Sequence, residues 1–305
     1  MNKKHKYYIL GALVLAFLLL AGWYLHSHFI PVLQPRGTVA RQERNLIIVA
    51  LALAALVVVP VYTMTIMIAW KYRASNTKAR YTPDWDSHRL MEITWWAIPG
   101  AIILVFSIIT WNSSRTLDPF RPLSSAQSPL TIQVVALDWK WLFIYPQQKI
   151  ASVNYLQMPV NVPVNFELTS DSVMNSFWVP ALGSQIYTMP GMSTQIHLMA
   201  TQAGSYRGSS ANISGEGFAS MDFMAQASSS SGFAQWVKQA QASSNWLDLV
   251  SYSNLAKPSQ NTPVTYFSHA YSSLYNYVIG RYMAPAFIFP TNGQAVPKTA
   301  GVHGG

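Results

Sequence analysis

The sequence predicts a membrane α-helical hairpin, residues 45–112, that carries an all-β sandwich domain, residues 126–228, with a short helical C-terminal extension, residues 231–283. Three observations support this fold class. Two long apolar segments contain no charged residue, the pattern then changes to short runs that alternate apolar and polar residues, and the basic residues gather around the apolar segments. A chain of 305 residues is long enough for a membrane part and one packed domain.

The first element, residues 1–30, is either a signal sequence or an N-terminal membrane anchor. It has a basic start and then an apolar run, "MNKKHKYYILGALVLAFLLLAGWYLHSH". The segment "LLAGW" is similar to a lipoprotein cleavage box, but Trp23 stands where the lipid-bearing cysteine would be, so lipidation there is impossible. Leu19 is a poor residue for signal peptidase recognition, which favours retention as an anchor. Both readings stay open at this point.

The hairpin consists of two predicted transmembrane helices. Leu46–Trp70 has no charged residue, and at about 1.5 Å per residue it exceeds the ~30 Å hydrocarbon core. Pro60 lies inside it and should bend it locally. Ile93–Trp111 is the second span, with tryptophans at both ends where an aromatic belt would lie.

Charge sets the orientation of the hairpin and excludes one class of partner. The loop between the spans contains five basic residues, which makes it cytoplasmic and places everything after Trp111 on the opposite side: Lys71, Arg73, Lys78, Arg80 and Arg89. Although the net charge is +9, residues 126–230 hold only 3 Lys+Arg against 5 Asp+Glu. The β domain therefore has no basic surface for phosphates, and nucleic-acid binding is not expected.

The β domain is predicted from half-buried strand patterns. Prolines recur too often between residues 159 and 190 for long helices, and four stretches alternate apolar and polar residues over part of their length: "LTIQVVALDWKWLFIYP", "VPVNFELTS", "STQIHLMA" and "SMDFMAQA". The chain has no cysteine, which excludes disulfides, thiolate metal sites and a cysteine nucleophile.

Two motifs in this domain, "NSFWVPALG" and "SANISGEGFASM", carry a specific resemblance. Together with the two spans they resemble subunit II of the haem-copper respiratory oxidases. That resemblance implies a cupredoxin-like sandwich, which in the cytochrome c oxidase members holds a binuclear copper centre, CuA. The copper pattern of that branch is a histidine before "SWxVPxLG" and then C-x3-C-x3-H-x2-M.

Most of the CuA ligands implied by the resemblance are replaced in this sequence. The histidines fall on Asn175 and Phe218, and the bridging cysteines fall on Ser210 and Ser214. The residue whose backbone carbonyl serves as a ligand falls on Asn212, and the methionine on Met221. A mixed-valence copper pair needs thiolate bridges and imidazole, and serine hydroxyls are neither soft nor ionised near neutral pH. We therefore expect no metal at these six vestigial positions.

The altered loop has two interpretations. In the first, the loop closes the sandwich, with Phe218 packed in place of the imidazole and Ser210, Asn212 and Ser214 hydrogen-bonded within the loop. In the second, another metal binds at Met221, but the motif offers it no second good ligand. The first is favoured.

Loss of the ligands within an intact scaffold indicates the quinol-oxidising branch of the superfamily. Three further stretches resemble subunit II of bo-type or ba-type ubiquinol oxidases: "AWKYRASN", "LDWKWLFIYP" and "TSDSVMNSFWVPALGSQIYTMPGM". The resemblance implies that subunit I holds the haems and copper and binds ubiquinol. This chain would then be a structural subunit with no catalytic residue and no cofactor of its own, in contact with subunits I, III and IV and the lipid bilayer. It would be a multi-pass protein of the bacterial inner membrane with a periplasmic β domain.

Glu92 has two interpretations. "MEITWWAIPG" is similar to the family pattern E-x2-W-x3-P, and the resemblance implies that such a glutamate lies near the mouth of the K proton channel. Alternatively, Glu92 is an acid favoured by the dipole at a helix N-terminus. Both remain open.

Other aromatic and terminal features suggest packing rather than chemistry. In the copper branch an aromatic at the position of Trp139 or Trp141 lies on the path of electron entry, but without copper we expect core packing and contact with subunit I. Residues 284–305 are predicted to be a disordered tail. Two rival functions are a cytochrome c oxidase subunit that relays electrons through copper, and a free-standing membrane-anchored cupredoxin-like binding or assembly module.

Overall fold

The computed structural model describes residues 3–80 and 86–283, and it divides into two units. One unit is the helical part Gln42–Arg121, and the other contains the first 41 residues together with everything from Pro122 onward. The predicted tail 284–305 lies outside the described residues.

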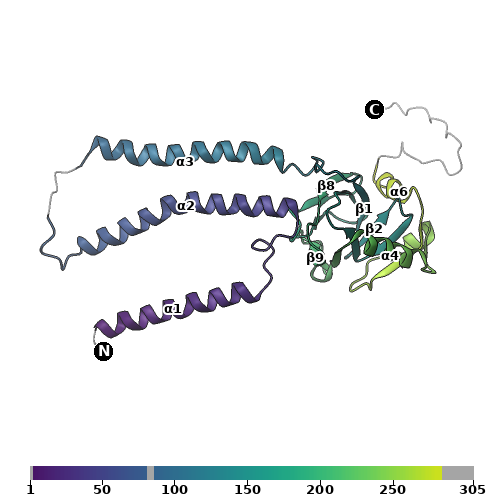
Figure 1. The fold of residues 1–305 in the computed structure, drawn as a ribbon, viewed down its shortest axis with the longest axis horizontal. Helices are drawn as coiled ribbons and strands as arrows, with labels where there is room; N and C mark the ends of the chain where they lie inside the picture. The colour runs from purple at the N-terminus through teal and green to yellow at the C-terminus, as the bar shows by residue number, and fades with distance from the viewer. Residues whose placement is uncertain (1–2, 81–85, 284–305) are drawn as a thin grey trace, which may run out of the picture. The chain divides into compact units, whose positions relative to one another are not determined.

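Three long helices come first in the chain (Figure 1): α1, Lys3–Ser27, α2, Thr38–Lys71, and α3, Arg89–Thr116. Both predicted helices are confirmed, and α2 and α3 are long and apolar enough to cross a membrane, with mean hydropathies of 2.7 and 2.0 in their most apolar windows. Polar helix-forming residues flank the apolar runs, so α2 begins well before the predicted start at Leu46, and α3 extends beyond its predicted segment at both ends. The apolar part of α1 is shorter, Gly11–Ser27.

The β domain contains two packed sheets, as predicted. Strand order in the first sheet is β12-β3-β2-β1-β5-β8 and in the second β4-β10-β9-β6-β7. The strands are β1, Leu130–Leu137; β2, Lys140–Tyr145; β3, Ile150–Val153; β4, Tyr155–Pro159; β5, Val164–Ser170; β6, Asn175–Trp178; β7, Ile186–Thr188; β8, Thr194–Leu198; β9, Gly204–Ser210; β10, Asp222–Ser228; and β12, Thr265–Phe267.

Aromatic side chains fill the core between the sheets. Trp141 and Phe143 of β2 meet Phe177 of β6 and Phe223 of β10, with ring centroids 5.0–6.4 Å apart. Phe177 and Phe223 are stacked at 5.3 Å. Such contacts stabilise beyond the burial of apolar area alone. These contacts join aromatic rings only, so they stabilise the sandwich without the help of a metal ion.

The C-terminal extension covers the outer face of the first sheet. Successive side chains of a strand point to opposite faces, so Trp141 and Phe143 belong to the inner core while Leu142 and Ile144 belong to a second cluster. That cluster continues into four elements of the extension: β11, Trp246–Leu247; α5, Leu249–Leu255; β13, His269–Ala270; and α6, Leu274–Gly280. The first helix of the extension, α4, Ser230–Gln241, instead packs Trp236 and Ala240 against the inner core. The extension is thus helical only in part, and its strand β12 pairs with β3 as an added edge of the sheet.

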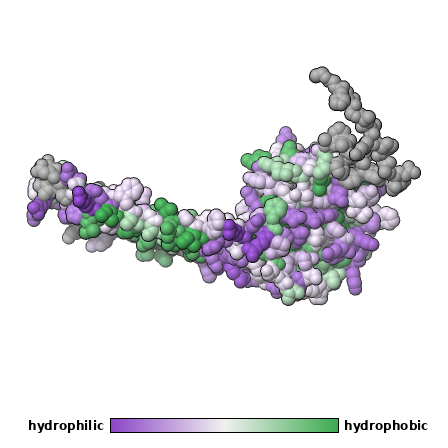
Figure 2. Space-filling view, turned by 90° about the horizontal axis from the view of Figure 1, so that it is seen from above, coloured by the Kyte–Doolittle hydropathy of each residue, from purple (hydrophilic) through white to green (hydrophobic). Residues whose placement is uncertain are grey.

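The segment between α1 and α2 is fastened to the β domain. The amide of Arg36 donates to Ala181 O at 2.8 Å, and Gly37 forms a bridge with Ala200. A Cβ at Gly37 would lie 2.4 Å from Leu182 O, so only glycine allows this approach. Within the helical unit, apolar side chains gather along the helices (Figure 2).

Candidate functional site

The six vestigial positions lie at the ends of β6 and β9 and on the loop that leads to β10. Asn175 is the first residue of β6 and Ser210 the last of β9, and the loop contains a short 3-10 helix, η1, Phe218–Ser220. Because β6 pairs with β9 in the same sheet, the two motifs that are separate in the sequence meet at one end of the sandwich.

Asn175 and Ser210 form a buried hydrogen-bonded pair. The Ser210 hydroxyl lies 3.1 Å from Asn175 Oδ1 and 3.1 Å from Asn212 O, either of which can accept its proton. The amide nitrogen of Asn175 donates to Val173 O at 3.0 Å. Both side chains are buried and bonded, so neither carries an unsatisfied group that would call for an external ligand.

The rest of the loop is held by its own side chains and by a tryptophan. Asn212 Nδ2 donates to Met174 O at 2.9 Å, and Trp139 Nε1 donates to Ser214 O at 3.1 Å. The Ser214 hydroxyl approaches the sulfur of Met221 at 3.9 Å. A Cβ at Gly217 would come 2.3 Å from the Trp139 ring, so the indole lies directly against the loop backbone. The loop is therefore fixed by backbone carbonyls and packing.

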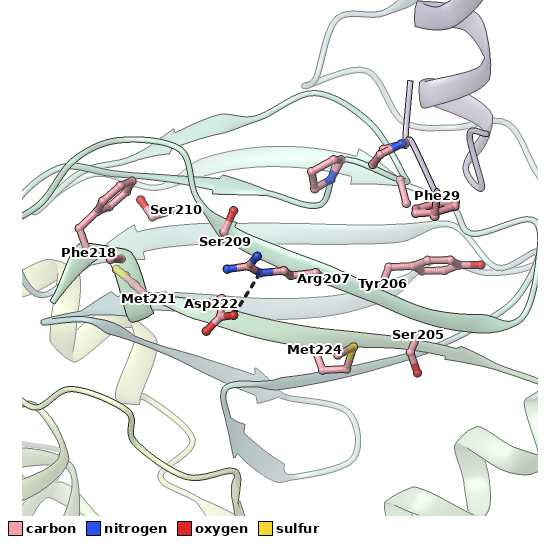
Figure 3. A pocket seen from close by; sticks show the side chains of 14 residues that line it. Phe29, Ser205, Tyr206, Arg207, Ser209, Ser210, Phe218, Met221, Asp222 and Met224 are labelled. Atoms are coloured by element: carbon pink, nitrogen blue, oxygen red, sulfur yellow. Dashed lines mark hydrogen bonds and ion pairs between the residues drawn. The ribbon is translucent and has the colours of Figure 1, made fainter. Parts of the chain in front are cut away.

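Phe218 is half-buried and lines a groove of about 580 Å³ (Figure 3). Figure 3 shows Phe218 and Met221 at one end of the groove, and Arg207 with Asp222, an ion pair at 3.1 Å, midway along it. The ring of Phe218 thus lines this groove, and its packing in place of an imidazole stays a prediction. Met221 is almost fully buried and belongs to the sandwich core.

These residues do not fit a binuclear copper centre. The positions that need thiolate and imidazole hold two hydroxyls, one amide and one phenyl ring, and a thioether is a weak ligand by itself. Among residues 3–80 and 86–283, no group of three or more His, Asp or Glu side chains could hold a metal ion. We therefore derive no electron-transfer step through this loop.

The two tryptophans of "DWKW" have packing roles. Trp141 is fully buried, with edge contacts to Phe177 at 5.6 Å and Phe223 at 5.7 Å. Trp139 has a φ of 62° and caps the loop as described above. Core packing is confirmed for Trp141, whereas Trp139 is partly buried and packs against the edge of the core. Contact with another subunit stays a prediction.

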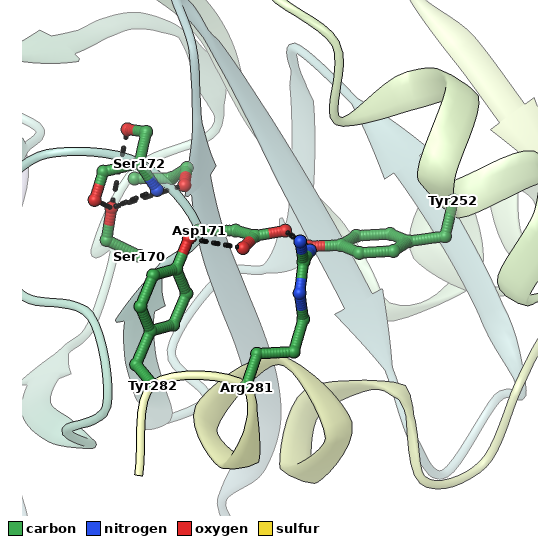
Figure 4. Close-up of polar contacts among 7 residues, drawn as sticks. Ser170, Asp171, Ser172, Tyr252, Arg281 and Tyr282 are labelled. Carbon is green, nitrogen blue, oxygen red and sulfur yellow. Dashed lines mark hydrogen bonds and ion pairs between the residues drawn. The ribbon is translucent and has the colours of Figure 1, made fainter. Parts of the chain in front are cut away.

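A second polar site surrounds Asp171 (Figure 4), and it was not predicted from the sequence. Its carboxylate is 1% exposed and accepts three bonds: from Tyr252 Oη at 2.5 Å, Arg281 Nη1 at 2.6 Å and Tyr282 Oη at 2.7 Å. All three donors come from the C-terminal extension. Burial and the bond to Asp171 raise the pKa of Tyr252 above its ordinary value and raise that of Tyr282 to about 12. Asp171 and its donors are 81 to 111 residues apart in the sequence, so no local sequence pattern predicts this cluster.

Lys140 makes a second connection to the extension. Its side chain is buried, and Nζ donates to Lys257 O at 2.8 Å and to Ser259 Oγ at 2.6 Å. Burial lowers the pKa of Lys140, against an opposing effect from Asp138. The extension is thus held to the β domain by charged side chains at two separate points.

Glu92 takes part in a cap at the start of α3. Its Oε1 accepts a bond from the His88 amide at 3.3 Å, while His88 Nδ1 accepts one from the Met91 amide at 3.3 Å. This reciprocal arrangement satisfies two of the free amides at a helix N-terminus. It supports the interpretation of Glu92 as a helix-start acid and leaves a proton-transfer role untested.

Comparison with known proteins places the chain in a family. Residues 147–228 match the family described as "Cytochrome C oxidase subunit II, periplasmic domain", and residues 241–286 match the "COX Aromatic Rich Motif". The chain is 51% identical to the cytochrome bo(3) ubiquinol oxidase subunit 2 of Pseudomonas aeruginosa over 248 residues, which cover 81% of this chain and 75% of the relative. The chain belongs to the quinol oxidase subunit 2 family.

Two further relatives support this membership. The cytochrome bo(3) ubiquinol oxidase subunit 2 of Pseudomonas putida is 48% identical over 285 residues, covering 92% of this chain and 88% of the relative. The ubiquinol oxidase subunit 2 of Acetobacter aceti is 45% identical over 286 residues, covering 93% and 89%. The predicted quinol-oxidising branch of the haem-copper oxidases is thereby confirmed, and the comparisons give no support to a free-standing module.

Proposed function

We propose that this chain is the structural subunit II of a terminal ubiquinol oxidase, and that its β domain does not relay electrons. Subunit I of the same complex would bind ubiquinol and hold the haems and copper, and subunits III and IV would complete the assembly in the bacterial inner membrane. The cupredoxin-like domain would lie in the periplasm. The chain would contribute assembly and cover for its neighbour.

One observation carries this proposal. In a member of the quinol oxidase family, Asn175 and Ser210 bond to each other at 3.1 Å where the copper-bearing branch needs imidazole and thiolate. A buried pair whose hydrogen bonds are satisfied stabilises the loop without metal. The loop therefore lacks the ligand set that an electron-carrying metal centre would need.

The helical unit supports the proposed assembly role. Residues of α2 and α3 in their apolar windows are exposed, and side chains such as Leu51, Val59 and Ile103 are at least 60% exposed. In a membrane such surfaces contact lipid or other helices. The exposed apolar surfaces of α2 and α3 are long enough to pack on a larger membrane subunit.

Purification through a tag on the full-length chain in a mild detergent tests the proposal. We expect a haem protein to copurify, with haem absorption in the optical spectrum and ubiquinol-dependent oxygen consumption. Isolation of the chain without any haem protein would contradict the proposed assembly role.

We also propose that Glu92 supplies protons at the cytoplasmic edge of the complex. Its half-buried carboxylate is at the start of α3, and ionisable groups at a membrane edge are frequently functional. The Glu92→Gln variant tests this role separately from capping, because a glutamine oxygen can still accept the bond from the His88 amide.

If Glu92 supplies protons, the Glu92→Gln complex should retain its haem content but consume oxygen more slowly, with the deficit growing as the pH rises and free protons become scarce. The matched control is His88→Asn, which keeps a capping side chain and leaves Glu92 in place. Undiminished turnover of Glu92→Gln at every pH would eliminate the proton-entry role and leave the cap alone.

A further inference from the structure

The helical hairpin has two adjoining hollows of different chemistry. The first, of about 450 Å³, is apolar and lies between α2 and α3, with lining residues that include Leu56, Pro60, Met64, Leu90, Trp95 and Pro99. The second, of about 580 Å³, lies at the C-terminal end of α2 and includes Met64, Trp70, Lys71, Tyr72, Arg73 and Asn76. Met64 lines both hollows, so they adjoin at this residue.

The apolar hollow arises from the backbone as well as from side chains. Pro60 and Pro99 are both in helix interiors and both line this hollow. A proline ring displaces the preceding turn of its helix and removes one hydrogen bond. Facing prolines on two neighbouring helices therefore hold the helices apart over a short length and leave a gap at that depth.

The length of the two hollows matches one leaflet of a bilayer. From Leu56 to Lys71 the helix advances 15 residues, or about 22 Å at ~1.5 Å per residue. Half of a bilayer, including its headgroup layer, measures about 20–22 Å. The basic end of the hollows therefore falls at headgroup level when the apolar end reaches the middle of the membrane.

The basic end offers two cations, Lys71 and Arg73. Lys71 Nζ lies 5.5 Å from the Tyr72 ring centroid, and the Arg73 guanidinium lies 5.9 Å from the Trp70 ring centroid and donates to Ser75 Oγ at 3.0 Å. Within residues 42–80 and 86–121, neither cation forms an ion pair with a carboxylate. Aromatic rings position both cations at the membrane surface, and both remain available to an anion.

We propose that these hollows bind one anionic phospholipid of the cytoplasmic leaflet. Its phosphate headgroup would pair with Lys71 and Arg73, and one acyl chain would enter the apolar hollow past Met64 as far as Leu56. A helix of another subunit is the alternative occupant of the apolar part, and the experiment below distinguishes it from a lipid. Basic pockets beside transmembrane helices on the cytoplasmic side are suited to anionic headgroups.

The experiment measures phospholipid retained by the full-length chain, purified with its natural partners in detergent. After a delipidating wash, bound lipid is identified by mass spectrometry, and rebinding is titrated with phosphatidylglycerol, phosphatidylethanolamine or inorganic phosphate. The variants are Lys71→Gln/Arg73→Gln at the headgroup end and Val57→Phe in the apolar hollow, which Val57 also lines. The control is Arg115→Gln/Arg121→Gln, which removes the same charge from the opposite end of the hairpin.

We expect one tightly retained anionic phospholipid in the wild type and in the control. Lys71→Gln/Arg73→Gln should weaken phosphatidylglycerol binding about 30-fold, the effect of two lost juxtamembrane charges. Val57→Phe should weaken binding of any phospholipid, because it fills the hollow, and inorganic phosphate should not compete at millimolar concentration.

Three results would overturn the proposal. The first is equal retention in all variants. The second is equal affinity of the wild type for phosphatidylethanolamine and phosphatidylglycerol, which would show that the cations are not used. The third is an absence of bound lipid together with cross-links from Val57 to another subunit, which would show that a protein helix fills the hollow.

Discussion

Single side chains fasten the C-terminal extension to the β domain, and Asp171 is the foremost of them. A carboxylate that is 1% exposed is costly to bury, and it is tolerated here because two tyrosine hydroxyls and the Arg281 guanidinium bond to its oxygens. Removal of the charge leaves Arg281 without its partner while the tyrosines keep only a weaker acceptor.

Asp171→Asn should lower the free energy of unfolding by about 2–3 kcal/mol, which is less than a fully buried ion pair would cost because Arg281 is partly exposed. The control Asp222→Asn breaks the exposed pair with Arg207 and should cost less than about 1 kcal/mol. Thermal unfolding of the full-length chain in detergent, followed by near-ultraviolet circular dichroism, compares the two. Equal destabilisation would show that the Asp171 cluster adds nothing beyond a surface ion pair.

At the scale of elements, the extension behaves as a second layer on the first sheet. Leu142 and Ile144 of β2 are buried under it, and β12 lengthens the sheet at β3. Tyr252 and Tyr282 join this layer to Asp171, and both have raised pKa values. The folded state therefore keeps tyrosine protons at a pH where the unfolded chain, with a tyrosine pKa of about 10, loses them.

The stability that Tyr282 contributes is complete below about pH 10 and is lost as the pH rises from about 10 toward 12, the pKa of Tyr282. Tyr282→Phe removes one hydrogen bond, so the variant should be less stable than the wild type at pH 8. The difference should shrink by pH 12, where the wild-type hydroxyl also ionises. Unfolding at a series of pH values measures this, with the exposed Tyr187→Phe as the control. A difference that stays constant with pH would contradict the role of Tyr282.

The helices and the main strands could be predicted from sequence because their signals are local. Uncharged apolar runs gave α2 and α3, and alternation gave β1, β2, β5, β8 and β10. Strand β9 was not foreseen, since "GSYRGSS" has little apolar alternation and is defined by its pairing with β10. The Asp171 cluster and the strand β12 depend on contacts between residues at least 81 positions apart, which no sequence window contains.

At the candidate site the sequence predicted the residues and hydrogen bonding within the loop, but not the bond that joins the two motifs. The family resemblance related Asn175 to Ser210, and the structure adds the hydrogen bond between them. It also places Trp139 over the loop, where Gly217 leaves room for the indole. Neither contact could be foreseen, because both depend on how two loops fold over the end of the sandwich.

For the whole molecule, the proposed role follows from a scaffold that is stable without metal. The aromatic core between the sheets, the bonded Asn175–Ser210 pair and the outer layer of the extension all act independently of copper. A domain of this kind can serve as a rigid cover on a membrane partner. Under the proposed function, this domain holds no redox centre for electron transfer.

The most direct test of this claim is the ubiquinol-dependent oxygen consumption, per haem, of the complex that carries Ser210→Ala and Met221→Leu. These changes remove the Ser210 hydroxyl and the Met221 sulfur with little change in side-chain volume. We expect turnover within about twofold of the wild type, because neither residue would act on the reacting atoms. A loss of more than about tenfold per haem would contradict the proposed role and show that electrons pass through this domain.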